Sequence, residues 1–372
     1  MNQKRLDQDI KNYHEMAPYQ LGKVAKETMF LESMKLLTSY HSANCSQYQN
    51  MLNTLGVTSE ALSSISDVPF LPVSLFKSLS LKSIPEADVF KTMTSSGTTG
   101  QAVSKIYLDK STVASQQKAL TKIVSSYTGG SRMPMLIIDS PSVLKNRKMF
   151  SARGAGILGF SIFGSKRAYA LDDEMNLNVD QIMEFVEKHQ DRTIFLFGFT
   201  FMVWKHFYQK LKEYNQVNER KIDLSNAVLI HGGGWKKLQN ESVTPEEFGK
   251  ALNRVCSIPE EQIHDYYGMV EQTGSIYMQC SHGHLHVSHY SDVIIRRAAD
   301  FSICDIGERG IIQVLSVLPH SYPGHSLLTE DEGVLLGEDN CPCGRKGKYF
   351  KIFGRLKNAE IRGCSDTYAT QF

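Results

Sequence analysis

A run of small hydroxyl and glycine residues, positions 94–100 in the stretch KTMTSSGTTGQ, has a composition suited to binding an anion. Five hydroxyl side chains stand beside two glycines in this run, and glycine lets a ligand approach the backbone amides. Backbone N–H groups and hydroxyls together can surround a phosphate from several sides. The candidate phosphate ligands are Ser95, Ser96, Gly97, Thr98, Thr99 and Gly100.

The same run also has the composition of an ordinary turn, because serine, threonine and glycine are common in loops. It is not a P-loop, because the pattern GxxxxGK[ST] is absent and Lys105 comes five residues after the last glycine. The composition alone therefore leaves a phosphate loop and a simple turn as alternatives.

Four further motifs follow this loop in order along the chain: HGGGWKKL (231–238), YYGMVEQTG (266–274), GERGIIQVLSVLPHSYPGHSLLTEDEG (307–333) and FGRLKNAEIRGC (353–364). Together with TSSGTTGQ, they resemble the ordered motifs of the adenylate-forming enzymes, the superfamily of acyl-CoA synthetases and luciferases. The chain length, the segment LIHGGGWKKL and an end just past IRGCSDTYA narrow the resemblance to the acyl-protein synthetases of the bacterial bioluminescence fatty acid reductase system. The resemblance covers most of the chain.

This resemblance implies an α/β fold, the large N-terminal domain of an adenylate-forming enzyme with mixed sheets and flanking helices, and with the C-terminal domain largely missing. It implies an AMP-forming acid–thiol ligase that uses ATP and Mg²⁺ to activate a long-chain fatty acid, with tetradecanoate as the expected substrate. The acyl group would pass to a cysteine of this chain and then to a fatty acid reductase subunit, supplying aldehyde for luminescence. An acyl transferase is left open as a further member of the multienzyme complex.

The motif YYGMVE resembles the adenine and magnesium site of the superfamily, which implies roles for Tyr267, Gly268 and Glu271. In this comparison Glu271 is the metal carboxylate, whereas a glutamate outside such a motif is usually a solvated surface group. The glycines of HGGGW follow the β-prone run AVLI, so we expect them at the carboxyl end of a strand, where open α/β sheets bind ligands. Their backbone could lie against adenine, and a tight turn is the alternative; these glycines are Gly232, Gly233 and Gly234.

The segment SLLTEDEG resembles the superfamily's Thr-Gly-Asp motif, although Thr329 is followed here by Glu330 and Asp331. We assign Asp331 as the acceptor from the ribose hydroxyls, while Glu330 in place of glycine makes the local turn a question. Arg355 of FGR matches the arginine at the superfamily's domain hinge, where a planar guanidinium suits ribose or phosphate. Lys105 stands in AVSK where many relatives have PKG, so it is not given that lysine's role.

Cys364 lies in the short stretch that follows the hinge motif. The superfamily normally continues with a mobile C-terminal domain that carries a lysine assisting adenylation, whereas only nine residues follow Gly363 here. A cysteine in such a tail could take the acyl group as a thioester and carry it to a partner, and the resemblance implies this role. A buried, inert thiol is the commoner fate of a cysteine, but a position close to the chain end argues for exposure.

A second group of cysteines lies in CSHGHLH (280–286) and CPCGR (341–345). Some phenylacetate-CoA-ligase-like relatives have a cysteine, a histidine six places on and a later Cys-Pro-Cys pair, which here selects Cys280, His286, Cys341 and Cys343. Three thiolates and one imidazole match a closed structural zinc site. Unliganded thiols are the alternative, because the Cys-x-Cys spacing is tighter than the common two-residue spacing.

The composition excludes some partners. The 372 residues carry 41 basic and 39 acidic side chains spread along the chain, so no electrostatic footprint for nucleic acid is visible. The start MNQKRLDQDIKNYHEM has no apolar core, and no run approaches the roughly 18 apolar residues of a membrane-spanning helix. We therefore expect a cytoplasmic protein, in which seven cysteines serve as reduced thiols, metal ligands or catalytic groups.

The hydrophobic pattern predicts a helical N-terminal region followed by an α/β part, and the resemblance implies where the parts end. We predict a helical region over residues 1–87, an α/β core over 88–355 and a short mobile tail over 356–372. The helix-like spacing of residues 29–56 ends at Gly56. Beyond it, β-rich runs alternate with helical stretches, which is typical of α/β proteins. The predicted strands are MPMLIIDS, RTIFLFGFT, NAVLIHGG and GIIQVLSVL, and the predicted helices are VDQIMEFVEKHQ and TPEEFGKALNRVC.

The most aromatic segment, TIFLFGFTFMVWKHF (193–207), is predicted to be a buried strand that runs into a helix. The alternative is one wall of an acyl tunnel, because a strand edge of phenylalanine and glycine could line an apolar slot.

Two other functions stay open at this point. An acyl- or aryl-CoA ligase belongs to the same superfamily, and the missing C-terminal domain counts against it. A non-catalytic scaffold that binds an adenylate and positions a partner is the other, and the retained Glu271, Asp331 and Arg355 count against it.

Overall fold

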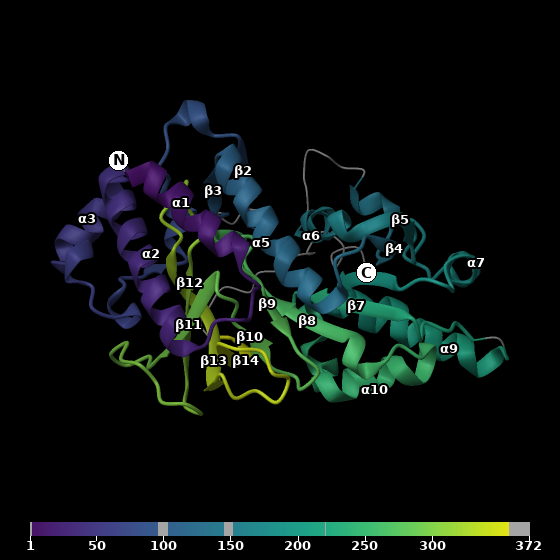
Figure 1. The fold of residues 1–372 in the computed structure, drawn as a ribbon. Helices are drawn as coiled ribbons and strands as arrows, with labels where there is room; N and C mark the ends of the chain where they lie inside the picture. Colours follow the sequence, from purple (N-terminus) through teal and green to yellow (C-terminus); the bar gives the residue numbers. More distant parts are fainter. Residues whose placement is uncertain (1, 96–102, 145–151, 220, 357–372) are drawn as a thin grey trace. The chain divides into compact units, whose positions relative to one another are not determined.

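The computed structural model describes residues 2–95, 103–144, 152–219 and 221–356 (Figure 1). Within them the chain forms two compact units. The first contains residues 2–127, 268–277 and 284–356, and the second contains residues 128–267 and 278–283. The boundaries that we predict at residues 87 and 355 stay predictions.

Helices form the N-terminal part of the first unit. The predicted helical run of residues 29–56 is divided between two helices, because Cys45 adopts an extended conformation (φ −133°) between them. The second helix ends as predicted at Gly56, whose φ of 64° is left-handed and suits glycine. The helices of this unit are α1 (Asn2–Glu15), α2 (Lys23–Asn44), α3 (Ser46–Leu55), α4 (Leu75–Ser78) and α5 (Lys110–Thr128).

A mostly antiparallel sheet forms the rest of the first unit. Its strand order is β11-β12-β13-β14-β10, and the short strand β1 adds in parallel to β13. A separate hairpin pairs β2 with β3. The bounds are β1 (Leu71–Pro72), β2 (Lys91–Thr94), β3 (Lys105–Leu108), β10 (Leu285–His286), β11 (Ser291–Arg296), β12 (Arg309–Ser316), β13 (Ser326–Glu338) and β14 (Lys348–Arg355).

The second unit contains a parallel group of strands in the order β5-β4-β6-β7-β8. Every residue of β4, β6 and β7 is buried, as expected for parallel strands covered on both faces. The strands are β4 (Met133–Ile138), β5 (Gly164–Tyr169), β6 (Ile194–Phe199), β7 (Ala227–Gly232) and β8 (Ile263–Tyr267). The helices are α6 (Ala152–Phe160), α7 (Val179–Lys188), α8 (Thr200–Met202), α9 (Gln209–Val217) and α10 (Pro245–Cys256), with a π-helix at Val203–Tyr208.

Strand β6 places alternate side chains in two different layers. Leu196 belongs to the core that includes Phe207 and Leu252, on the side where Figure 1 shows α9 and α10. On the other face, Phe197 stacks on Phe160 of α6 with ring centroids 4.3 Å apart. The predicted buried strand running into a helix is therefore confirmed for this aromatic segment, and the acyl-tunnel interpretation stays a proposal.

The other predicted strands and helices are also present. MPMLIIDS and NAVLIHGG contain β4 and β7, GIIQVLSVL covers all of β12 except Arg309, and the two predicted helices correspond to α7 and α10. A capping box starts α10, in which the Thr244 and Glu247 side chains each accept the other residue's backbone N–H. The predicted α/β class is confirmed.

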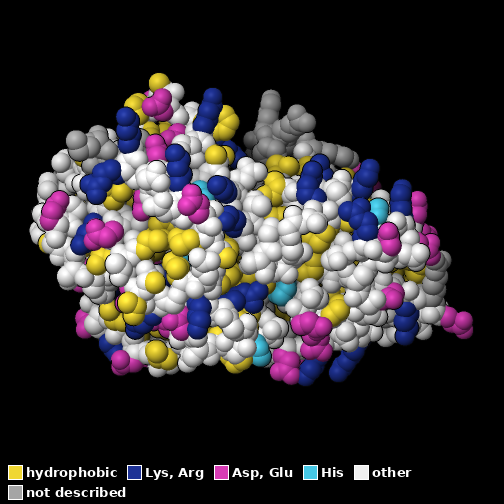
Figure 2. Space-filling model, in the orientation of Figure 1, with side chains coloured by type: hydrophobic (Ala, Val, Ile, Leu, Met, Phe, Trp, Pro, Cys, Tyr) yellow, Lys and Arg dark blue, Asp and Glu magenta, His cyan; other side chains and the backbone are white. Residues whose placement is uncertain are grey.

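No helix among the described residues is long and apolar enough to cross a membrane. On the face drawn in Figure 2, basic and acidic side chains are interspersed, as the nearly balanced charge of the sequence leads one to expect.

Candidate functional site

The run of hydroxyl and glycine residues at positions 94–100, here called the hydroxyl-glycine loop, lies in the connection between the two strands of the β2–β3 hairpin. Thr94 and Lys105 are the last paired residues of that hairpin, and Ser95 N–H donates to the Ser104 carbonyl oxygen at 3.1 Å. The Ser95 hydroxyl accepts a hydrogen bond from Ser104 N–H at 2.9 Å, so this side chain closes the base of the loop. The other predicted phosphate ligands, Ser96, Gly97, Thr98, Thr99 and Gly100, lie outside the described residues.

The glycines of HGGGW lie where we expect them, at the carboxyl end of a strand. Gly232 is the last residue of β7 and pairs with Tyr266 of the parallel strand β8, one residue before Tyr267. A Cβ on Gly232 would lie 2.6 Å from the Tyr266 ring and 2.8 Å from its carbonyl oxygen, so this contact requires glycine. Gly233 and Gly234 follow with φ of 85° and 65°, so the chain also turns here.

A pocket of about 470 Å³ opens in the second unit beside these strand ends. Its polar wall includes Thr200 after β6, His231 on β7 and Asp265 on β8, and its apolar wall includes Trp235 and Phe248. The Thr200 hydroxyl and His231 Nδ1 share a 3.0 Å hydrogen bond, and His231 Nδ1 lies 3.7 Å from Asp265 Oδ1. Three neighbouring strands therefore present polar groups to a single pocket.

His231 and Asp265 are not among the site residues that we predict from the sequence. Burial lowers the pKa of His231 to about 3, so its ring is neutral near pH 7. The Asp265 side chain is 40% exposed, but its Oδ1 atom is buried, and this burial raises the pKa of the carboxyl group to about 7. The signal in the sequence that could have found Asp265 is the two-residue period of a β-strand. This period directs Asp265 to the same face of β8 as Tyr267, which is a predicted site residue.

Glu271 lies in the first unit, on a 3-10 turn formed by Val270–Gln272. Its side chain is buried, and the residue is 3% exposed. Tyr322 Oη donates a hydrogen bond to the Glu271 carbonyl oxygen at 2.8 Å. Burying an ionised carboxylate costs free energy, and a bound divalent cation is one group that offsets this cost. Gly268 lies on the exposed stretch just before the turn.

Asp331 and Arg355 lie directly opposite each other on β13 and β14. The structure thus brings together the two residues predicted to contact ribose or phosphate. The question about the turn is also answered, because β13 continues through Glu330 without a turn. Glu330 Oε2 lies 3.7 Å from Arg355 Nη1, so this glutamate contributes to the electrostatic environment of the arginine.

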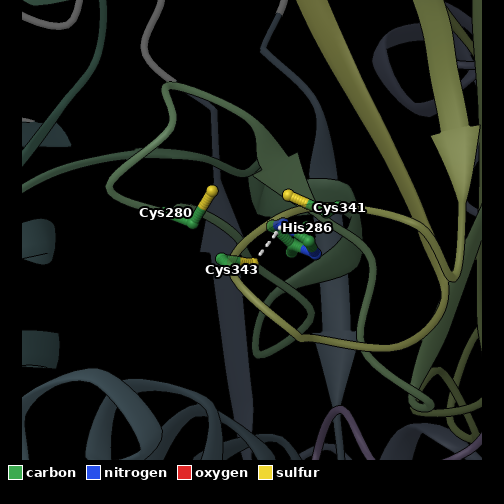
Figure 3. Close-up of side chains that lie close together, drawn as sticks. All are labelled: Cys280, His286, Cys341 and Cys343. Carbon is green, nitrogen blue, oxygen red and sulfur yellow. Dashed lines mark hydrogen bonds between the residues drawn. The ribbon is translucent and has the colours of Figure 1, made fainter.

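The four predicted zinc ligands lie close together (Figure 3). One ligand atom from each of Cys280, His286, Cys341 and Cys343 lies within 4.8 Å of the others. Cys280 follows the short strand β9 (Tyr277–Gln279), His286 is on β10, and the last two are in the turn between β13 and β14. Residues 61 positions apart in the chain therefore share one cluster.

The chemistry of this cluster suits a tetrahedral metal site. His286 Nε2 lies 3.3 Å from Cys343 Sγ, and His286 is fully buried. Burial, together with the charges of Arg345 and His284, lowers the pKa of His286 to about 4, which leaves the neutral imidazole that binds metals. A soft set of three thiols and one imidazole favours Zn²⁺ over a hard cation such as Mg²⁺.

Cys364 lies outside the described residues. Among the described cysteines, burial raises the pKa of Cys256 to about 12, so this thiol is a poor nucleophile. Cys45 and Cys304 are also buried.

Two curated relatives span nearly the whole chain. A long-chain-fatty-acid–luciferin-component ligase of Vibrio harveyi is 25% identical over 360 residues, covering 92% of this chain and 90% of the relative. The Aliivibrio fischeri protein of the same name is 24% identical over 341 residues, covering 88% and 84%.

Solved structures of 2-hydroxyisobutyryl-CoA ligase share the fold. An open conformation bound to 2-HIB-AMP and CoA has a TM-score of 0.64 at 14% identity, covering 93% of this chain and 78% of that one. The postadenylation state with 2-HIB-AMP has a TM-score of 0.66, also at 14% identity, covering 93% and 71%. These similarities confirm the fold of an adenylate-forming ligase. The sequence profile of the family described as acyl-protein synthetase, LuxE, matches residues 8–372, and the chain therefore belongs to that family.

Proposed function

We propose that the chain is an AMP-forming ligase that activates a long-chain fatty acid with ATP and transfers the acyl group to a protein thiol. The observation that carries the proposal is the family match over residues 8–372. The names of the two curated relatives, long-chain-fatty-acid–luciferin-component ligase, supply the substrate class. Tetradecanoate is the fatty acid to test first.

In the first step, a carboxylate oxygen of the fatty acid attacks the α-phosphorus of ATP, and pyrophosphate leaves. Two anions must approach each other in this step, so groups that neutralise the phosphate charge account for much of the rate acceleration. Glu271 would hold Mg²⁺, which offsets the charge of the phosphates when bound. The hydroxyl-glycine loop would hold the departing phosphates, and Arg355 would contact ribose or phosphate.

The adenine base is assigned to the pocket at the carboxyl ends of β6, β7 and β8. Its volume of about 470 Å³ lies within the usual range of small-molecule sites, about 300–1,000 Å³. The Asp265 carboxylate would accept from the exocyclic amino group. Gly232, Gly233, Gly234, Tyr267 and Gly268 do not line this pocket, and their assignment to adenine rests on the resemblance of their motifs. Asp331 would accept from the ribose hydroxyls.

In the second step, the Cys364 thiolate attacks the acyl carbonyl carbon, the bond from that carbon to the phosphate oxygen breaks, and AMP leaves. A thiolate of a partner, assigned to a fatty acid reductase subunit, then takes the acyl group by thioester exchange and regenerates the Cys364 thiolate. Exchange between two thioesters is nearly balanced in free energy, which suits a carrier.

The cluster of Cys280, His286, Cys341 and Cys343 is assigned to a structural Zn²⁺. With four protein ligands the metal would have no open position for substrate, so its contribution would be to folding.

Pyrophosphate release from tetradecanoate and ATP, with and without CoA, tests the proposal. We expect release without CoA, together with label from the fatty acid on the protein. Label that appears only on CoA would identify an acyl-CoA ligase, and absence of release would indicate a scaffold.

The acceptor is tested by replacing Cys364 with serine. The variant should still form acyl adenylate, whereas the hydroxylamine-labile label on the protein should disappear. Cys304→Ser is the matched control, because Cys304 is buried and has no assigned role. Labile label on the Cys364→Ser protein would assign the acceptor to another residue.

A further inference from the structure

The turn that carries Glu271 is held by a side chain from a distant part of the first unit. Tyr322 lies 51 residues further along the chain, and its hydroxyl donates to the Glu271 carbonyl oxygen at 2.8 Å. The Tyr322 ring is fully buried and makes an edge contact with Phe76, with centroids 6.1 Å apart. This hydroxyl therefore has a fixed position from which it holds the backbone of Glu271.

Gln272, the next residue, anchors the same turn through its own side chain. Its Nε2 atom donates to the Val314 carbonyl oxygen of β12 at 3.1 Å and to the Gly324 carbonyl oxygen at 2.8 Å. Both partners are carbonyl oxygens, so the orientation of the amide is determined. The residue is 2% exposed, so both hydrogen bonds lie in the interior, where losing a donor costs more than at the surface.

The segment that supplies these partners approaches Glu271 closely. A Cβ on Gly324 would lie 2.8 Å from Tyr322 Cδ2 and 3.0 Å from the Glu271 carbonyl oxygen, so the approach depends on glycine. Two residues after Gly324 the chain enters β13, the strand that carries Asp331. Tyr322 and Gly324 thus belong to the segment that leads directly to the ribose candidate.

We propose that Tyr322 and Gln272 are positioning residues for Glu271, which hold its carboxylate in the place where the nucleotide-bound magnesium ion is needed. The inference rests on the proposed function, because it takes Glu271 as a magnesium ligand. Tyr322 holds the Glu271 carbonyl oxygen itself, and Gln272, the residue that follows Glu271, is tied to two carbonyl oxygens of other segments. Groups that support metal ligands in this way typically change metal affinity or activity by about 10- to 100-fold.

Tyr322→Phe removes one hydroxyl and keeps the ring, so it is the cleanest test. In pyrophosphate exchange we expect about a tenfold rise in the Mg²⁺ concentration for half-maximal rate. At saturating Mg²⁺, the KM for ATP should stay within about twofold of wild type, since the hydroxyl does not support the adenine pocket. Gln272→Met, which keeps length and removes the donors, should raise the Mg²⁺ requirement at least as much.

Tyr40→Phe is the matched control. Its hydroxyl is also buried and donates to a backbone carbonyl oxygen, that of Ser83, at 3.3 Å. This variant should lose thermal stability to a similar extent, with an unchanged Mg²⁺ requirement. If Tyr322→Phe shows the same Mg²⁺ requirement as wild type, the positioning role is refuted.

Two further measurements separate this inference from the proposed function. Glu271→Gln should slow exchange by roughly 100-fold; a wild-type rate in that variant would remove Glu271 from the metal site and overturn both proposals. Hydrogen–deuterium exchange needs no activity: amides of residues 270–275 should exchange faster in Tyr322→Phe and not in Tyr40→Phe. Unchanged exchange there would refute the positioning role even where Glu271→Gln is slow.

Discussion

Two stacked histidines in the interior of the first unit should make the protein sensitive to acid. His325 lies against His41 with ring centroids 5.0 Å apart and planes 21° apart. Its Nε2 atom shares hydrogen bonds of 3.2 Å with Thr38 Oγ1 and with Tyr48 Oη. Burial lowers the pKa of His325 from 6.5 to about 3, so the folded protein keeps this ring neutral where the unfolded chain protonates it.

The sign and size of the effect follow from this difference in pKa. The unfolded state binds the extra proton as the pH falls below 6.5, so stability decreases from there down to about pH 3, where the folded state also protonates. At pH 5, about 1.5 pH units below the unfolded pKa, the loss from His325 is about 2 kcal/mol. At pH 7.5 the same contribution is close to zero. Burial lowers the pKa of His41 as well, and its loss has the same sign.

Urea unfolding at pH 7.5 and pH 5 tests this prediction with wild type and His325→Gln. The variant keeps a hydrogen-bonding side chain and cannot be protonated, so its stability should fall by about 2 kcal/mol less than that of wild type. Tyr48→Phe is the control, because it removes one partner of His325 and retains the imidazole, so its pH dependence should match wild type. Equal pH dependence of wild type and His325→Gln would refute the reasoning.

Three other substitutions test the pocket and the metal cluster. Cys341→Ser should reduce bound zinc from about one equivalent and lower the Tm, whereas Cys256→Ser should leave the metal content unchanged; metal-free wild type that is folded and active would reject the zinc site. Gly232→Ala should destabilise the fold by about 1–3 kcal/mol in urea unfolding, because the new Cβ would overlap Tyr266, and full stability would contradict that contact. The KM for ATP should rise as the pH falls through about 7 in wild type, where Asp265 protonates, and should show no such step in Asp265→Asn; the same step in both would remove Asp265 from adenine binding.

Most of the regular structure could be predicted from local sequence. The parallel strands β4, β6 and β7 are continuous apolar runs, and α10 begins at a capping box encoded within four residues. The break at Cys45 could not be predicted in this way, because the apolar spacing continues through it. Where such a spacing is uninterrupted, the packing of the two helices decides where the first one ends.

The candidate site residues also fall into those that the sequence predicts and those that only the structure shows. The motifs themselves are enough to predict Gly232, Glu271 and Asp331 as candidate site residues, because each is one residue in a short pattern whose order along the chain is informative. They also identified the four residues of the metal cluster, but only the fold brings their ligand atoms within 4.8 Å.

The residues that depend on the tertiary structure alone are those with no distinctive neighbours in the chain. His231 and Asp265 become polar groups of one pocket because β7 and β8 are parallel neighbours, and their burial sets their pKa values. Tyr322 is an ordinary tyrosine until the chain folds and brings its hydroxyl to the Glu271 carbonyl oxygen. Helix caps and strand periodicity depend on a few adjacent residues and are therefore readable in sequence. Desolvation and contacts across 51 residues depend on how the whole unit packs, and so only the tertiary structure decided them.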